Sequence, residues 1–131
     1  MPETNLPDYA AYDYALIRVV PLVERGEFIN VGVILFCRTQ KFLAARLTLR
    51  KDCLLALAPT IDLAQIQRDL ALFPRICAGA GPIGQLDQTE RFHWLVAPRS
   101  TIIQTSPVHS GLCTDPNKTL DHLVNTLVAA Q

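Results

Sequence analysis

Apolar residues follow two different periods along the chain. Between residues 14 and 49 they are rich in β-branched side chains and are broken only by the short polar turns ERGE and RTQK, which predicts strands. We expect these strands at residues 14–23, 28–37 and 42–49. The middle strand is apolar on both faces, so it should be central and covered on both sides. Turns this short join antiparallel neighbours, and the three strands therefore form a meander.

Beyond residue 50 the apolar residues recur at helical spacing. We expect a short helix in KDCLLALAP, two further helices, a fourth strand at residues 100–106 and a last helix. Capping patterns mark the starts of the later helices: Asp62 with Gln65, Asp87 with Glu90, and Asp115 before Pro116. Pro74 should kink the second helix or end its regular part, Gly79 would suit a left-handed terminator, and Pro98 should end the third helix.

The predicted order is β-β-β-α-α-α-β-α, without the regular βαβ alternation of a parallel sheet. This order is typical of an α+β fold, with a small antiparallel sheet and helices packed mainly on one face. We expect one domain over residues 12–131, behind a flexible lead-in at residues 1–11. The place of the fourth strand in the sheet is left open.

Composition narrows the class of protein. The 12 Lys and Arg residues balance the 12 Asp and Glu residues, whereas a general nucleic-acid binder usually carries a basic excess. The start, MPETNLPDYAAYDY, has no signal-peptide pattern. The longest apolar runs, such as VGVILFC, fall short of the about 20 residues that cross a bilayer. We therefore expect a cytoplasmic protein that binds neither membranes nor nucleic acids in general.

Signals for metal or nucleotide binding are weak. Four cysteines stand singly in apolar surroundings without a CxxC pair: Cys37, Cys53, Cys77 and Cys113. We expect reduced, buried thiols rather than disulfides or a zinc site, and no cofactor. GAGPIG matches G-x-G-x-x-G, but a helix precedes it and Pro82 removes an N–H donor, whereas the dinucleotide fingerprint follows a strand. We interpret it as a helix terminator and a flexible connection.

Polar residues interrupt two apolar strands. Arg18 lies in the first strand, and Asn30 lies in the second, where Gly32 should leave a gap on its face. An arginine in a covered strand needs an anionic partner or an opening to water. It either forms an internal ion pair or lines an anion-binding cleft. The internal candidates for an ion pair are Asp13, Glu24 and Glu27. Whether Arg18 and Asn30 share a face depends on the loop length, because a one-residue slip exchanges the faces.

The segment RFHWLVAPRSTIIQTSPVHSG, residues 91–111, concentrates polar groups at the ends of elements. We expect a polar rim there that faces a ligand or partner, with six candidate binding residues: Arg91, His93, Arg99, Gln104, Ser106 and His109. The last four are predicted to converge on a concave, anion-binding surface, because a guanidinium, an amide and a hydroxyl together hold an anion. Alternatively, Arg99 pairs with Glu90 and the other groups only satisfy the strand edges.

Long segments of the chain resemble an uncharacterised bacterial family, the domain of unknown function 3037 family. They are YDYALIRVVPLVERGEFINVGVILFC, RICAG, GPIG and RFHWLVAPRSTIIQTSPVHSGL, and the likeness covers about residues 12 to 128. It implies no established activity. It implies an accessory role, because members are often encoded beside a kinase resembling the HipA toxin-type Ser/Thr kinases. The family's recurrent polar positions match eleven residues here: Arg18, Glu24, Arg25, Glu27, Asn30, Arg91, His93, Arg99, Gln104, Ser106 and His109.

We therefore expect a small binding or accessory module without catalysis of its own, whose partner is a HipA-like kinase or a small anionic ligand. A second hypothesis is an enzyme acting on a phosphorylated or nucleotide substrate through His93, His109 and Arg99. A third is a structural or oligomer-forming subunit. Two histidines within reach of one pocket atom would favour the enzyme, and an exposed apolar groove beside the polar rim would favour a protein partner.

Overall fold

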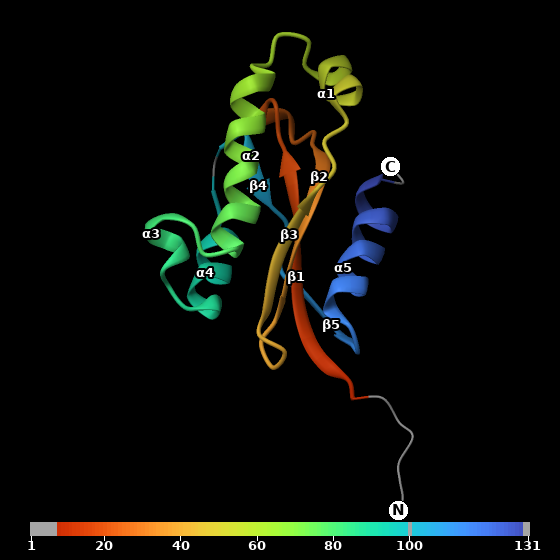
Figure 1. The fold of residues 1–131 in the computed structure, drawn as a ribbon. Coiled ribbons are helices and arrows are strands. Elements are labelled where there is room, and N and C mark those ends of the chain that lie inside the picture. Colours follow the sequence, from red (N-terminus) through yellow and green to blue (C-terminus); the bar gives the residue numbers. More distant parts are fainter. Residues whose placement is uncertain (1–7, 100, 130–131) are drawn as a thin grey trace, which may run out of the picture.

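The computed structural model describes residues 8–99 and 101–129 and arranges them in three layers (Figure 1). A twisted antiparallel sheet forms the middle layer. Helices α2 (Leu63–Cys77) and α4 (Gln88–Leu95) lie against one face of the sheet, which we call the α2 face, and α5 (Pro116–Val124) lies against the other, the α5 face. The α+β class, the antiparallel sheet and the gathering of helices mainly on one face are confirmed.

The sheet has the strand order β3-β2-β1, and β1 pairs on its far side with β4 and then with β5. The bounds are β1 Ala10–Val19, β2 Ile29–Cys37, β3 Phe42–Leu47, β4 Ile103–Thr105 and β5 His109–Cys113. The meander of β1 to β3 is as predicted. β1 starts at Ala10 rather than Tyr14, so Ala10 and Ala11 belong to the sheet and not to the expected lead-in. Residues 1–7 of that lead-in lie outside the described residues.

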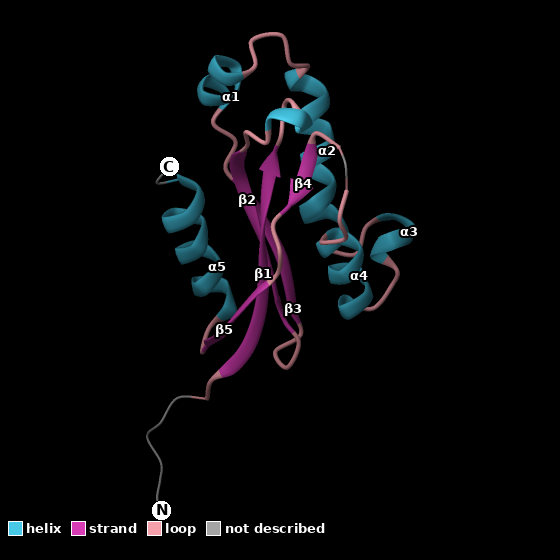
Figure 2. Ribbon diagram, turned by 180° about the vertical axis from the view of Figure 1, so that it is seen from behind, coloured by secondary structure: helices cyan, strands magenta, loops and turns pink. Residues whose placement is uncertain are grey.

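The edge formed by β4 and β5 departs from the prediction. The fourth strand is shorter than the expected residues 100–106, of which Ser100 is not described, and β5 replaces an expected loop. Ser106, Pro107 and Val108 separate the two strands, which lie end to end along β1 (Figure 2). Ser106 stays in the ladder, because its N–H donates to the Leu16 carbonyl and its Oγ accepts from the Leu16 N–H at 2.8 Å. Beyond Pro107 the first half of β1 is still open to pairing, and β5 fills it.

The helix starts follow their predicted caps. The side chains of Asp62, Asp87 and Asp115 accept hydrogen bonds from the first-turn N–H groups of α2, α4 and α5. The remaining helices are α1 (Lys51–Leu57) and α3 (Gly81–Gly84), with a 3-10 turn η1 (Val23–Arg25) and a π-helical turn η2 (Asn125–Ala129). α2 continues through Pro74 to Cys77, so Pro74 does not end the helix as one alternative had it. α4 ends at Leu95, ahead of Pro98.

The glycines of GAGPIG serve the backbone. Gly79 follows α2 with φ +97°, the left-handed conformation expected of a terminator. A Cβ on Gly84 would lie 2.3 Å from the carbonyl carbon of Gly79, so the loop closes on itself only because position 84 has no side chain. α3, which was expected as a loop, lies between these two glycines. The segment is a compact helix connection.

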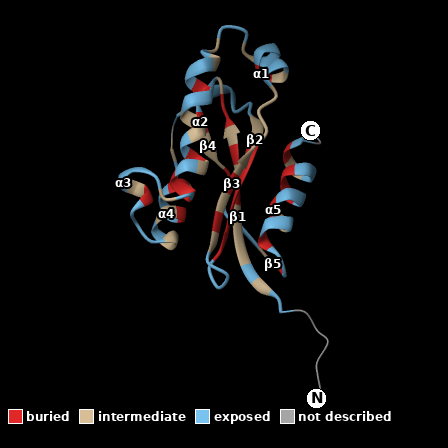
Figure 3. Ribbon diagram, in the orientation of Figure 1, coloured by how far each residue is buried: buried red, intermediate tan, exposed pale blue. Residues whose placement is uncertain are grey.

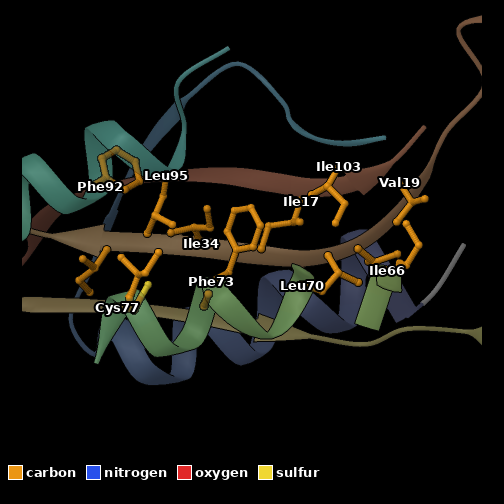
Figure 4. Close-up of a cluster of buried hydrophobic side chains, with 14 of the residues drawn as sticks. Ile17, Val19, Ile34, Ile66, Leu70, Phe73, Cys77, Phe92, Leu95 and Ile103 are labelled. Atoms are coloured by element: carbon orange, nitrogen blue, oxygen red, sulfur yellow. The ribbon is translucent and has the colours of Figure 1, made fainter. Parts of the chain in front are cut away.

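Two hydrophobic cores lie on the two faces of the sheet, and the buried positions of α2 and α5 lie on the sides of these helices that face it (Figure 3). The core on the α2 face is the larger, and its strands contribute Ile17 and Ile34 against Phe73 of α2 (Figure 4). The α5 core packs Val33 and Leu35 against α5 and η2. β2 is therefore central and covered on both sides, as predicted, with Ile29 only partly buried.

A β-bulge near the start of β2 sets which residues share a face. Ile17 pairs with Gly32, but the next residue, Arg18, pairs with Asn30, so Val31 is an extra residue in the ladder. Arg18 and Asn30 thus lie side by side on the α5 face. Gly32 pairs with Ile17 on the opposite face, so the expectation that it leaves a gap beside Asn30 is wrong. A Cβ at Gly32 would come within 2.6 Å of the Arg46 carbonyl oxygen, which explains the glycine.

Candidate functional site

An apolar groove of about 560 Å³ lies on the α2 side of the molecule. One wall is a side of α2, and the other is the segment from the end of α4 to β4. Three large apolar side chains lie in it and remain open to solvent: Leu72 at 47 %, Trp94 at 43 % and Ile102 at 40 %. The floor belongs to the core, with Ile66, Phe73 and Leu95. Exposed apolar residues gathered in one groove make it the candidate for an interaction site.

Arg99 lies in the wall of this groove, and backbone carbonyls of the same wall bind its guanidinium. Its Nη1 and Nη2 donate to the carbonyls of Leu95 and Trp94, both at 2.8 Å, and its guanidinium lies 4.8 Å from the centroid of the Trp94 ring. Burial lowers the pKa of Arg99 below its ordinary value. Arg99 thus closes the end of α4 and fixes Trp94. The described residues show no ion pair between Arg99 and Glu90.

Arg91 and His93 of α4 take no part in the groove. Arg91 is bound to backbone carbonyls at the end of α2 and beyond: it donates to Cys77 at 2.7 Å, to Leu86 at 2.9 Å and to Ile76 at 3.3 Å. These bonds tie α4 to α2, which is a structural role. His93 is exposed, with only the neighbouring Phe92 ring at 6.3 Å among its ring contacts. Neither residue is positioned beside the other candidates.

Three of the candidates form a row across the α5 face of the sheet. Arg18 of β1 pairs in register with Asn30 of β2 on one side and with Gln104 of β4 on the other. The Arg18 guanidinium lies 4.0 Å from the centroid of the Phe28 ring, and burial lowers its pKa below the ordinary value. Gln104 donates from Nε2 to the Thr101 carbonyl at 2.9 Å. We call Asn30, Arg18 and Gln104 the polar row.

Ser106 and His109 continue along the same edge but have other surroundings. Ser106 is buried, and its hydroxyl accepts from Leu16 and donates to the Pro107 carbonyl at 2.9 Å. His109 is exposed and stacks on Tyr14, with ring centroids 5.4 Å apart. Tyr14 in turn lies 6.0 Å from Tyr12, whose pKa burial raises. The Ser106 hydroxyl is committed to the backbone.

The predicted convergence of Arg99 with Gln104, Ser106 and His109 is wrong. Arg99 lies in the groove with Ile103, whose side chain is buried on the α2 face, and Gln104 follows on the opposite face because strand residues alternate. His93 on α4 and His109 on β5 likewise lie on elements of different layers. What the structure brings together is the polar row, whose cross-strand pairing the sequence left open.

The apolar residues of the groove were not among the predicted site residues, although the sequence contains a weak signal for their exposure. Leu72 lies beside the apolar stripe of α2 that contains Ile66, Leu70 and Phe73, so it could not join the core. Ile102 and Ile103 are adjacent, and in an extended segment only one of them can face inward. Apolar residues outside a core stripe therefore pointed to an exposed apolar surface.

The cysteines and the charge distribution give no sign of a metal centre. Cys37, Cys77 and Cys113 are buried, as predicted, while Cys53 is half-buried. Burial raises the pKa of the Cys77 thiol to about 12 and also raises that of Cys113. Within residues 8–99 and 101–129, no three His, Cys, Asp or Glu side chains gather in a way that could hold a metal ion. In the same ranges, no helix is both long and apolar enough to span a bilayer.

Comparison with known proteins gives one result. Residues 14–128 match the model of the family described as protein of unknown function (DUF3037). No curated protein and no solved structure matches the chain. The match runs from within β1 to within η2 and so includes both the groove and the polar row.

Proposed function

Since the chain belongs to the DUF3037 family, whose description states no activity, we propose a function from its geometry: it is a protein-binding accessory module that holds an apolar segment of its partner in the α2–α4 groove. The observation that carries the proposal is the exposure of Leu72, Trp94 and Ile102 in one groove. Burying such side chains against a partner releases water from apolar surface, which is the main driving force of association.

The shape and charge of the groove favour a particular kind of segment. Its α2 wall runs from Asp62 to Ile76, about 21 Å at 1.5 Å per residue, which suits an amphipathic helix of similar length. Asp62 and Asp69 lie on this wall, whereas the Arg99 guanidinium is held by backbone carbonyls. We therefore expect apolar anchors flanked by a lysine or arginine that faces α2.

The partner we propose is the HipA-like Ser/Thr kinase that the family resemblance implies. Support for this choice comes from the resemblance alone, and support for a protein partner comes from the groove. Such a kinase would place the chain in the cytoplasm, as its sequence predicts. Catalysis by His93, His109 and Arg99 has less support, because neither histidine lines the groove that holds Arg99.

The test is binding of the chain to the kinase encoded beside it, with Trp94 as the probe. Trp94 is the one tryptophan of the sequence, so 5-fluorotryptophan labelling gives one ¹⁹F signal, which should shift when the groove fills. Leu72→Asp and Ile102→Asp should abolish the complex at micromolar concentrations without lowering Tm, since both side chains are exposed. Leu112→Asp is the matched control, because Leu112 is 68 % exposed and lies outside the groove.

Two results would contradict the proposal at different points. Absence of any complex at micromolar concentrations would remove the kinase as partner. A complex that survives both groove substitutions and leaves the ¹⁹F signal of Trp94 unchanged would remove the groove as the docking site.

A further inference from the structure

The Arg18 guanidinium has no anionic partner within the part of the chain that the structure describes. Of the three carboxylates that could have paired with it, Glu27 binds Arg25 at 3.1 Å, and Asp13 accepts from the Ser110 hydroxyl at 2.6 Å. Glu24 forms no ion pair with Arg18 among the described residues. The internal ion pair, one of the two interpretations of this arginine, therefore has no support in residues 8–99 and 101–129.

The surroundings of Arg18 raise the need for such a partner. Its Nε is buried and has no hydrogen-bond acceptor among the described residues. The Phe28 ring lies against the guanidinium and attracts its charge, but a ring face does not satisfy the in-plane N–H donors. Burial of this one N–H donor without an acceptor is unfavourable, and the lowered pKa of Arg18 reflects the partial burial of its side chain.

We propose that Arg18 binds an oxyanion, the carboxylate or phosphate group of a small ligand, on the α5 face of the sheet. The planar fork of a guanidinium matches two oxygens of such a group, and its two Nη groups can donate side by side. Asn30 and Gln104 flank Arg18 in register on its two sides, so the strip of sheet around the anion is polar. Phe28 supports the guanidinium from outside the strand.

This site is independent of the groove. The polar row lies on the α5 face, whereas the groove lies among α2, α4 and the segment before β4. The ligand proposed here is a small anion and not a protein segment. Failure of either proposal therefore leaves the other untouched.

The experiment follows the ¹⁵Nε–¹Hε signal of Arg18 by NMR, together with Tm, while sodium phosphate or sodium acetate replaces sodium chloride at constant ionic strength. We expect a saturable shift of this signal and a rising Tm. A response to phosphate alone identifies a phosphate site, and an equal response to acetate identifies a site for carboxylates as well. No response to either anion, or the same response to chloride, would overturn the proposal.

Variants assign the response to Arg18. Arg18→Leu should lose the anion-dependent rise in Tm, and without oxyanion it should melt no lower than the wild type, since it removes a partly buried cation that has no anionic partner among the described residues. Arg18→Lys should bind about tenfold more weakly, because an ammonium cannot make the paired contact. The control is Arg25→Leu, because the Arg25 side chain is 61 % exposed and already paired with Glu27. A full anion response in Arg18→Leu would contradict the proposal.

Discussion

The two faces of the sheet are covered in different ways and leave different surfaces behind. On the α2 face, helices α1, α2 and α4 contribute to one large core, and the space that they leave is an apolar groove. On the α5 face, α5 and η2 pack chiefly over β2 and β3, and what remains on β1 is half-buried and partly polar. The same sheet therefore presents an apolar surface on one side and a cation on the other.

This difference is clearest in two arginines. Arg91, on the α2 side, donates three hydrogen bonds to backbone carbonyls through its Nε and Nη1. The Nε of Arg18, on the α5 side, has no hydrogen-bond acceptor among the described residues. Both stood as candidate binding residues in the sequence, and only their partners tell them apart. A candidate binding residue is better supported when the fold leaves its hydrogen-bond donors without acceptors in the protein.

The largest expected effect tests whether both faces are essential to the fold. Val33 and Ile34 are neighbours on β2 that point to opposite faces, and both are fully buried. Val33→Asp and Ile34→Asp should each unfold the protein, because an unpaired buried carboxylate costs several kcal/mol, on the order of the total stability. Circular dichroism melting measures this. A native-like melt of Val33→Asp would show that the α5 layer is dispensable.

An intermediate effect separates the two arginines. Arg91→Met should lower the free energy of unfolding by about 1–3 kcal/mol, because it leaves the part-buried Cys77 carbonyl without its donor. Arg18→Leu should not lower it in buffer without oxyanions. Urea denaturation of the two variants measures the difference. Equal destabilisation by both would mean that Arg18 is as structural as Arg91.

The effect that is smallest at neutral pH concerns Cys77 of the α2 core, because its thiol titrates only in alkaline solution. Its pKa is raised from 9.0 to about 12, so the folded state holds the thiol proton more tightly than the unfolded state does. The stabilisation from this proton is complete below about pH 9, the pKa of the unfolded thiol, and is lost as the pH rises toward 12. The wild type should therefore lose its advantage over Cys77→Ala across this range.

Urea denaturation at several pH values measures that loss, and subtracting the variant removes the titration of tyrosines and lysines. Parallel curves for the two proteins would show that burial does not hold the Cys77 proton. The half-buried Cys53 serves as the comparison, since a thiol reagent should reach it long before it reaches Cys77.

What could be predicted from the sequence was local. The caps at Asp62, Asp87 and Asp115 each depend on residues two or three positions away, and all three formed as expected. The meander followed from short turns between apolar runs. These signals lie within a few residues of one another, so no knowledge of distant partners is needed to read them.

What could not be predicted depends on partners far along the chain. HSGLC has no alternation of apolar residues, and it becomes a strand only because β1 offers an unpaired edge nearly a hundred residues earlier. The groove is the space left between α2 and β4, so no single segment encodes it. The polar row was found as separate candidates, because only the pairing of β2 with β1 and β4 with β1 joins them.

The bulge at Val31 also bears on how this segment can change in length. Val31 is extra in the ladder with β1, so a chain lacking it could pair regularly and still set Asn30 opposite Arg18. Such a deletion would sacrifice one buried side chain and the bond from the Thr48 N–H to the Val31 carbonyl. One residue lost or gained between Gly32 and Cys37 would instead exchange the faces of the adjoining residues. A deletion of Val31 therefore keeps Asn30 and Arg18 in register, whereas a change of length between Gly32 and Cys37 does not.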